Sequence, residues 1–178
     1  MIATRVELLD DLLQEHETAL GLDLQAYRNH AYRVLNFCTA LSPALPDRTP
    51  KLAIAVAFHD LGIWTARTFD YLPPSEMLAA AYLDSKGLGG WRGEVLGMIG
   101  QHHKITRCAP GTPPLVETFR RADWVDVTHG VVSHGLPRAF LRDVFGAFPD
   151  AGFHKRLLQL SWRRLLSHPL SPLPMMRL

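Results

Sequence analysis

The chain has 178 residues, of which 47% are hydrophobic and 20% are charged, and its formal net charge is +2. That composition is typical of one globular domain with a full apolar core. The small net charge argues against a nucleic-acid-binding surface, and no apolar run approaches the length of about 18 residues that a membrane-spanning helix requires.

The expected elements are all helices, because apolar residues recur at helical spacing and no segment has a clear strand pattern. Gly21 ends the first helix, and Asp23 is the expected N-cap of the second. A Pro-rich loop, residues 42–50, leads to the third. The fold class is therefore all-α, and the expected helices cover residues 2–20, 24–41, 51–61, 75–86, 91–103, 115–129, 138–148 and 153–166.

An uninterrupted apolar run that ends in His59 and Asp60 is the centre of the sequence. Thr49-Pro50 marks the start of this helix and Gly62 marks its end. A helix without a polar face must be buried on all sides, and a buried carboxylate is costly unless it is paired or bound to a metal. Imidazole and carboxylate together suit a divalent cation, and a hydrogen-bonded core pair is the alternative.

Three other helices also direct a potential metal ligand inward, each from an apolar face. These ligands are His30, then His102 with its neighbour His103, then Asp123. Asp126 shares the face of Asp123, where it either supports a ligand or makes a hydrogen bond at the helix end. A single buried histidine is usually satisfied by a backbone carbonyl, but an ordered set on four helices favours a metal site.

The last expected helix, residues 153–166, is basic and amphipathic. Its apolar face contains Leu157, Leu160 and Leu165, and its basic side chains point outward. We expect this face to pack on the rest of the domain, and attachment to an anionic surface is the alternative. Residues 63–72 have no clean period and are expected to form an ordered loop that covers the end of the buried helix.

The candidate ligands lie in four short segments that follow one another in helical context: residues 29–34, 57–62, 99–103 and 121–126. This pattern resembles the HD-domain superfamily of metal-dependent phosphohydrolases. The resemblance extends over about residues 24–130, which is most of the chain. It implies one HD-like helical bundle domain over residues 1–178, with the helices of residues 138–166 packed on the motif core.

The resemblance also implies a ligand set and a mechanism. His30, His59, Asp60 and Asp123 would bind one divalent ion, with Mn, Mg, Fe, Co and Ni as candidates. The ion would lower the pKa of its bound water and polarise a phosphoryl group. The catalytic residues would be Asp60, which orients or deprotonates the water, and His102 and His103, which bind phosphate, protonate the leaving oxygen or complete a second metal site.

The candidate substrate contacts are Lys104, Arg33, Trp64 and Tyr71. A structural ion pair is the alternative for Arg33, and plain packing is the alternative for the two aromatic residues.

The sequence departs from the family pattern at two positions, which bear on the activation of water and on the number of metal ions. Trp64 stands where some HD nucleotidases have a glutamate, so their scheme for activating water is not carried over. Dinuclear HD proteins place separated histidines on successive helices, whereas His102 and His103 are neighbours. This adjacency favours one ion over two.

The predicted function is metal-dependent hydrolysis of a small phosphate ester, with a nucleotide as one candidate. A di-iron HD-type oxygenase and a non-catalytic, metal-containing ligand-binding or regulatory module are the alternatives. The presence of only two cysteines and the lack of an apolar signal sequence indicate a cytoplasmic protein. We expect a small phosphorylated substrate, no nucleic-acid or membrane partner, and a monomer or homodimer.

Overall fold

The computed structural model describes residues 1–171 and 173–176, and all regular elements in these ranges are helical. The predicted all-α class is therefore confirmed. Among the described residues, none of the helices combines the length and the apolar composition that a membrane span requires. The elements are α1 (Glu7–Glu15), α2 (Glu17–Leu20), η1 (Gly21–Asp23), α3 (Leu24–Leu41), α4 (Arg48–Phe58), α5 (Gly62–Thr65), α6 (Leu72–Ser85), η2 (Gly89–Trp91), α7 (Arg92–Gln101), α8 (Pro114–Val127), α9 (Arg138–Ala147) and α10 (Phe153–Ser167).

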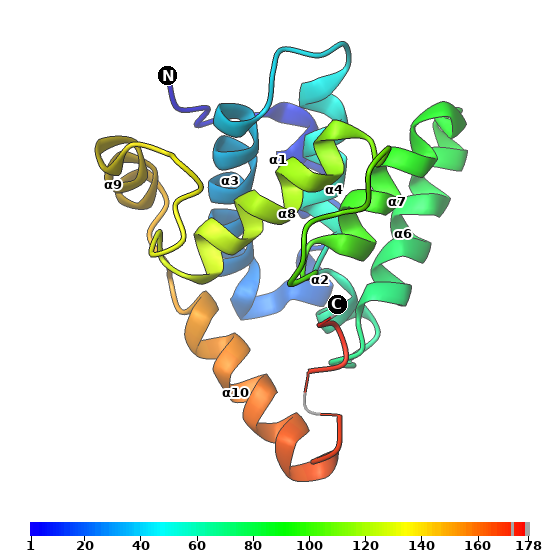
Figure 1. Ribbon diagram of the computed structural model, residues 1–178. Helices are drawn as coiled ribbons and strands as arrows, with labels where there is room; N and C mark the ends of the chain where they lie inside the picture. The colour runs from blue at the N-terminus through cyan, green and yellow to red at the C-terminus, as the bar shows by residue number, and fades with distance from the viewer. Residues whose placement is uncertain (172, 177–178) are drawn as a thin grey trace.

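The centre of the bundle consists of α3, α4, α7 and α8, which pack on one another around a shared hydrophobic core (Figure 1). On the outside, α1 packs on α4, α6 packs on α7, and α9 packs on α3. Helix α10 starts beside α3 and then extends away from the bundle, and residues 173–176, here called the C-terminal arm, lie back toward it (Figure 1). The four central helices are the ones that carry the candidate ligands.

Helix α4 is buried as its sequence predicts, since every side chain from Leu52 to Val56 is inaccessible to solvent. It begins at Arg48, two residues before Pro50, so the expected loop was too long at this end. Pro50 lies in the first turn, where the missing N–H of proline would have no helical partner in any case. The buried helix therefore delivers His59 and Asp60 to the middle of the bundle.

Gly62 does not end the buried helix, and this part of the prediction was wrong. Helix α4 ends at Phe58, and Gly62 is the first residue of α5 in the segment expected to be a loop. A Cβ at Gly62 would lie 2.5 Å from the backbone oxygen of Tyr71 and 2.9 Å from Oγ of Ser75. Glycine is required here because α6 begins in contact with this turn. Oγ of Ser75, in the first turn of α6, accepts a hydrogen bond from the Gly62 N–H at 2.9 Å.

We expect Gly62→Ala to lower the free energy of unfolding by about 1–3 kcal/mol, the usual cost of forcing a methyl group into a packed contact. Urea unfolding of the metal-free protein measures this. Gly93→Ala is the matched control, because Gly93 is exposed in α7 with no atom within 4 Å of the added Cβ. The control should be neutral or slightly stabilising. Equal unfolding midpoints for the two variants would contradict the steric argument.

The N-terminal helix is divided rather than continuous. Residues 1–6 precede the first helix, and His16 separates α1 from α2. Asp23 is helical and makes no N-cap hydrogen bond, so its predicted role was wrong. Its carboxylate instead accepts a hydrogen bond from Nε1 of Trp64 at 2.9 Å and pairs with Arg156 at 3.1 Å. Asp23 thereby ties the start of α3 to α5 and α10.

Helix α10 packs on the bundle mainly at its N-terminal end, where Phe153 is buried. Leu165, expected to point inward, is 38% exposed, which corrects the predicted packing face. Leu158, Trp162 and Leu166 form an exposed stripe at intervals of four residues along the part that leaves the bundle. The periodicity of the sequence predicts this helix, but it does not predict how much of the helix packs on the bundle.

Candidate metal centre

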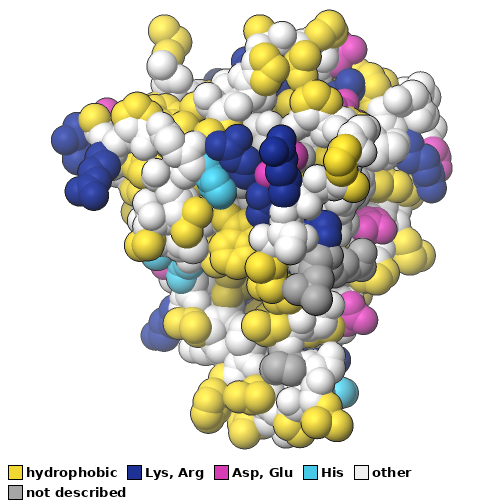
Figure 2. Space-filling model, viewed as in Figure 1, with side chains coloured by type: hydrophobic (Ala, Val, Ile, Leu, Met, Phe, Trp, Pro, Cys, Tyr) yellow, Lys and Arg dark blue, Asp and Glu magenta, His cyan; other side chains and the backbone are white. Residues whose placement is uncertain are grey.

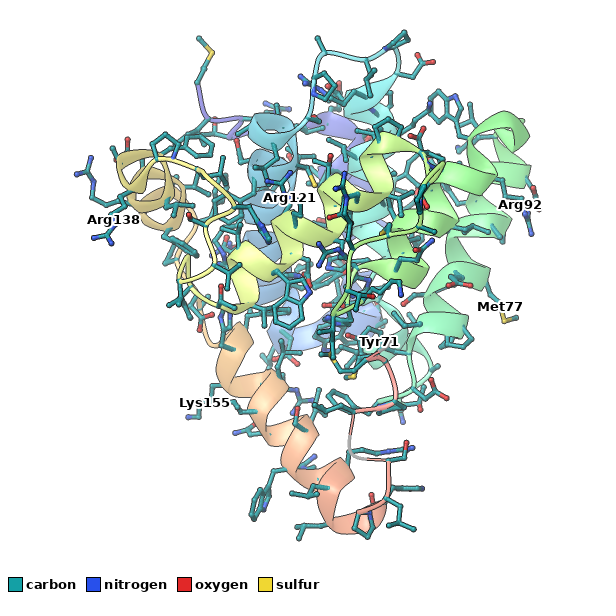
Figure 3. All side chains as sticks on the ribbon, in the orientation of Figure 1. Tyr71, Met77, Arg92, Arg121, Arg138 and Lys155 are labelled. Atoms are coloured by element: carbon teal, nitrogen blue, oxygen red, sulfur yellow. The ribbon has the colours of Figure 1, made fainter. Side chains whose placement is uncertain are left out.

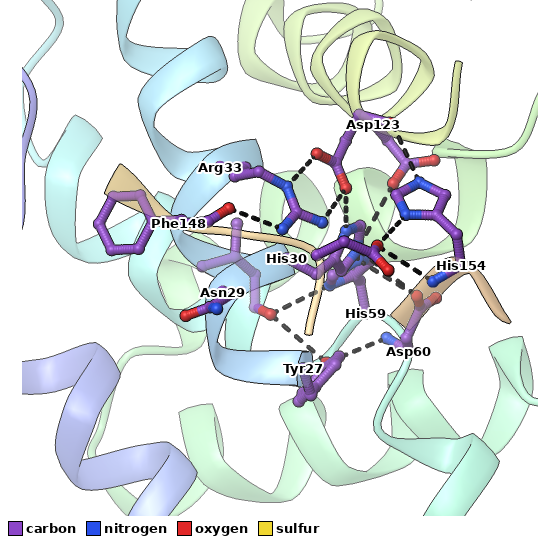
Figure 4. Close-up of polar contacts among 12 residues, drawn as sticks. Tyr27, Asn29, His30, Arg33, His59, Asp60, Asp123, Phe148 and His154 are labelled. Atoms are coloured by element: carbon purple, nitrogen blue, oxygen red, sulfur yellow. Dashed lines mark hydrogen bonds and ion pairs between the residues drawn. The ribbon is translucent and has the colours of Figure 1, made fainter. Parts of the chain in front are cut away.

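Three of the predicted ligands, His30, His59 and Asp60, come together inside the bundle, and the fourth, Asp123, faces them from α8 (Figure 4). His30 comes from α3, His59 and Asp60 from the turn after α4, His102 from the end of α7, and Asp123 from α8. Each of these residues is at most 2% exposed. Side chains from four separate parts of the sequence thus lie together in one buried cluster.

Asp60 lies at the middle of the cluster and uses its two oxygens in different directions. Its Oδ2 lies 3.6 Å from Nε2 of His30 and 3.5 Å from Nε2 of His59. Its Oδ1 lies 3.3 Å from Nε2 of His102. On the other side of the centre, Asp123 Oδ1 is 3.8 Å from Nε2 of His30.

The three buried histidines are each anchored through Nδ1. His59 donates from Nδ1 to the backbone oxygen of Val56 at 3.0 Å, and His102 donates to that of Ile99 at 2.6 Å. His30 makes the same kind of bond to Oδ2 of Asp126 at 2.6 Å. A proton held at Nδ1 leaves Nε2 as the nitrogen that can bind a cation, which is the usual arrangement of metal-binding histidines.

The atoms that face the centre fit a metal ion. Nε2 of His30 and Nε2 of His59 are 2.8 Å apart, and two lone pairs at this distance repel unless a positive charge lies between them. Oδ1 of Asp60, Nε2 of His102 and both oxygens of Asp123 are buried and have no hydrogen-bond partner among the described residues. Such unpaired groups are costly. A divalent cation would satisfy all of them with a mixed N/O ligand set.

The cluster can be divided into two groups of potential ligands that share Asp60. One contains His30, His59 and Asp60, the other contains Asp60, His102 and His103, and in each group the ligand atoms lie within 4.8 Å of one another. The rings of His102 and His103 are 4.0 Å apart between centroids. His102 and His103 therefore lie close together although they are neighbours in the sequence. Their adjacency is thus no longer a reason to favour one ion over two.

Burial and the charges inside the cluster together set its protonation. It lowers the pKa of His59 to about 3, against the attraction of Asp60. Burial alone would raise the pKa of Asp60, but His59 and His102 outweigh it and lower that pKa. Burial raises the pKa of Asp123 to about 7, and the negative charge of Asp60 adds to this. At neutral pH the metal-free site therefore has a neutral His59, an ionised Asp60 and a partly protonated Asp123.

We expect metal affinity to fall when the pH drops below about 7. The raised pKa of Asp123 means that the metal-free protein keeps this proton up to about pH 7, and an ion must displace it. One displaced proton weakens the apparent affinity about tenfold for each pH unit below that value. Calorimetric titration with Mn²⁺ between about pH 5.5 and pH 8 measures this slope. An affinity that is flat over this range would contradict it, and Asp123→Asn should reduce the slope.

A layer of charge behind the ligands fixes their positions. Arg33 is completely buried and donates from Nε and Nη2 to the carboxylate of Asp126, the second of these at 2.8 Å, and from Nη1 to the oxygen of Phe148 at 3.1 Å. Asp126 also accepts the Nδ1 hydrogen of His30. The geometry supports the ion pair for Arg33 rather than the predicted phosphate contact. Of the two roles considered for Asp126, the geometry favours support of a ligand, because Asp126 orients His30.

The other predicted substrate contacts lie at different distances from the centre. Tyr71 is adjacent, with its hydroxyl 2.5 Å from Nε2 of His103. Trp64 packs on Tyr27 with ring centroids 4.9 Å apart, and Tyr27 in turn stacks on His59, so Trp64 is one layer removed. The ammonium of Lys104 donates to Oγ1 of Thr106 at 3.0 Å in an exposed position. Of these residues, the structure brings only Tyr71 against the cluster.

Tyr27 is a positioning residue that the sequence analysis placed on the inward face of its helix but gave no role. Its hydroxyl donates to the backbone oxygen of Ala57 at 3.0 Å and accepts the N–H of Asp60 at 3.3 Å. It therefore holds the turn that presents His59 and Asp60. The only indication of this role in the sequence is that Tyr27 lies three residues before His30, on the same face of the helix.

A further group of possible ligands, His129, Asp150 and His154, lies at the start of α10. Asp150 accepts hydrogen bonds from the backbone N–H groups of Gly152 and His154 and from the His154 ring. The other ring nitrogen of His154 lies 3.1 Å from the backbone oxygen of Asp126. We assign this group to the stabilisation of the helix start.

In comparisons with known proteins, no family profile, no curated protein and no solved structure matches this chain. The described residues show an all-helical bundle with a buried cluster of histidines and aspartates that could bind a metal ion.

Proposed function

We propose that the protein is a metal-dependent hydrolase of the HD type that acts on a small phosphate ester. One observation carries the proposal: three buried histidines, each anchored through Nδ1, turn Nε2 toward Asp60 and Asp123. Oδ1 of Asp60 and both oxygens of Asp123 have no hydrogen-bond partner among the described residues. A purely structural polar cluster would satisfy these atoms internally.

His30, His59, Asp60 and Asp123 would hold one ion, and Asp60, His102 and His103 would hold a second if the protein binds two. A bound divalent ion supplies a Lewis acid for the phosphoryl group and lowers the pKa of water. Asp60, ionised at neutral pH, would orient that water.

His103 and Tyr71 would act on the substrate side of the site. His103 is partly accessible, with 14% of its side chain exposed, and its Nδ1 lies 3.5 Å from Oδ2 of Asp123. Burial raises the pKa of Tyr71 well above its ordinary value, so its hydroxyl keeps its hydrogen and donates to Nε2 of His103. Burial lowers the pKa of His103 well below its ordinary value, so its ring is neutral at pH 7. With Tyr71 donating to Nε2, the ring hydrogen of His103 would lie on Nδ1, from which it could donate a hydrogen bond to a phosphoryl oxygen.

The test is metal content by mass spectrometry, followed by phosphate release from nucleotides and simple phosphomonoesters with Mn²⁺, Mg²⁺, Co²⁺ or Ni²⁺. Wild type should contain metal and release phosphate, and His59→Ala should do neither. His168→Ala is the matched control, because His168 is an exposed histidine beyond the end of α10. No metal in the wild type after incubation with excess ions, or activity that survives His59→Ala, would refute the proposal.

The sharing of Asp60 between two ligand groups also favours a second candidate, a di-iron oxygenase of the same fold type. Two irons per chain and substrate-dependent oxygen uptake, without phosphate release, would select this function. Bound metal with neither reaction would leave a binding or regulatory module.

A further inference from the structure

A pocket of about 550 Å³ opens on the metal centre, within the size range of small-molecule sites. Its inner end is formed by Tyr71, His103 and Asp123, the residues on the open side of the cluster. A molecule that placed a phosphate at the centre would therefore extend its organic part into this pocket.

The rest of the pocket is almost entirely apolar. Helices α8 and α10, the loop before α6 and the C-terminal arm form its walls, and their apolar residues are Phe69, Trp124, Val127, Leu157, Leu158, Leu173, Met175 and Met176. The remaining lining residues are His129, His154 and Ser161. Figure 2 shows hydrophobic side chains gathered on this face, between α8 and α10.

The walls offer little to a highly charged or hydroxyl-rich ligand. Among the described residues, no lysine or arginine lines the pocket. The side chains of Lys155 on α10 and Arg138 on α9 point outward, away from the bundle (Figure 3). A nucleoside polyphosphate needs cations for its outer phosphates and partners for its ribose and base, and burying such groups unpaired is unfavourable.

We propose that the substrate is a phosphomonoester of an apolar alcohol, with a medium-length alkyl or aryl group bound in this pocket. This inference rests on the proposed hydrolase function and narrows its substrate class. Phosphate goes to the metal centre, and the apolar group displaces water from the walls formed by α8, α10 and the C-terminal arm. Nucleotides, the more polar candidates, are disfavoured.

The first test is a series of alkyl phosphates from methyl to octyl, with AMP and glycerol phosphate as polar comparisons. One fully buried methylene is worth about 0.8 kcal/mol, which is about a fourfold change in binding. We expect kcat/KM to rise by up to about that factor per carbon until the pocket is full, and to exceed the value for AMP. Calorimetric binding of the matching alkylphosphonic acids, which are not hydrolysed, should show the same dependence on chain length.

Leu157→Gln tests the location of the apolar group, because Leu157 is a half-buried lining residue on α10. It should lower the ratio of hexyl to methyl phosphate kcat/KM by about tenfold or more, the loss expected from two or more buried methylenes. Leu165→Gln is the matched control on the same helix, outside the lining. It should leave the ratio unchanged.

The outcomes separate the two proposals. If no ester in the series is hydrolysed with any of the metals, the proposed function fails. If phosphate is released but kcat/KM is independent of chain length, or AMP is preferred, the hydrolase stands and the apolar substrate class is wrong. A chain-length dependence that Leu157→Gln leaves intact would overturn the assignment to this pocket.

Discussion

We expect Asp60→Asn to abolish metal binding at the proposed site and to lower kcat/KM for the proposed phosphate-ester substrate by about a thousandfold or more. Asp60 is a member of both ligand groups, with Oδ2 facing His30 and His59 and Oδ1 facing His102. Asparagine keeps the volume but replaces a negative charge with a neutral amide. Loss of an outer partner of a ligand already costs about 10–100-fold in metal-dependent sites, so loss of a central ligand should cost more.

Metal content and kinetics measured on the same preparation check this expectation. Asp143→Asn is the matched control, because its carboxylate is 52% exposed on α9 and pairs only with its neighbour Arg142 among the described residues. Circular dichroism and urea unfolding of the metal-free proteins show whether Asp60→Asn still folds. A folded Asp60→Asn protein with wild-type metal content would contradict the assignment of Asp60 as a ligand.

The sequence predicts those parts of this site that depend on local periodicity. His30 lies on the inward face of an 18-residue helix whose bounds, Leu24–Leu41, agree with the expectation. His59 and Asp60 follow a helix that has no polar side to expose. Asp123 shares an apolar face with Phe119. In each case the 3.6-residue repeat is sufficient to say which way the side chain points.

Features that depend on long-range packing could not be predicted in this way. Gly62 has the sequence context of a helix end, but the reason for a glycine there is the approach of Tyr71 and Ser75 from another helix. The adjacency of His102 and His103 favoured one ion over two, whereas the end of α7 brings ligand atoms of both side chains near Asp60. The apolar pocket is formed by distant segments that meet only in the folded chain.

The partner of Arg33 is also a long-range feature, since Asp126 is 93 residues away, and this pair gives the second large prediction. We expect either Arg33→Met or Asp126→Leu to lower the free energy of unfolding by about 3–5 kcal/mol. Each variant leaves an uncompensated charge in the core, and both side chains of the pair are 0% exposed. Urea unfolding of the metal-free proteins measures this loss.

The double variant Arg33→Met/Asp126→Leu separates stability from function. Removing both charges takes away the desolvation cost along with the attraction, so stability should return to within about 1–2 kcal/mol of the wild type. His30 would still lack the acceptor that holds its Nδ1 hydrogen at 2.6 Å. Metal affinity should therefore stay about 10–100-fold below that of the wild type. A double variant that regains both stability and affinity would show that Asp126 serves only to neutralise Arg33, and that His30 needs no orienting partner.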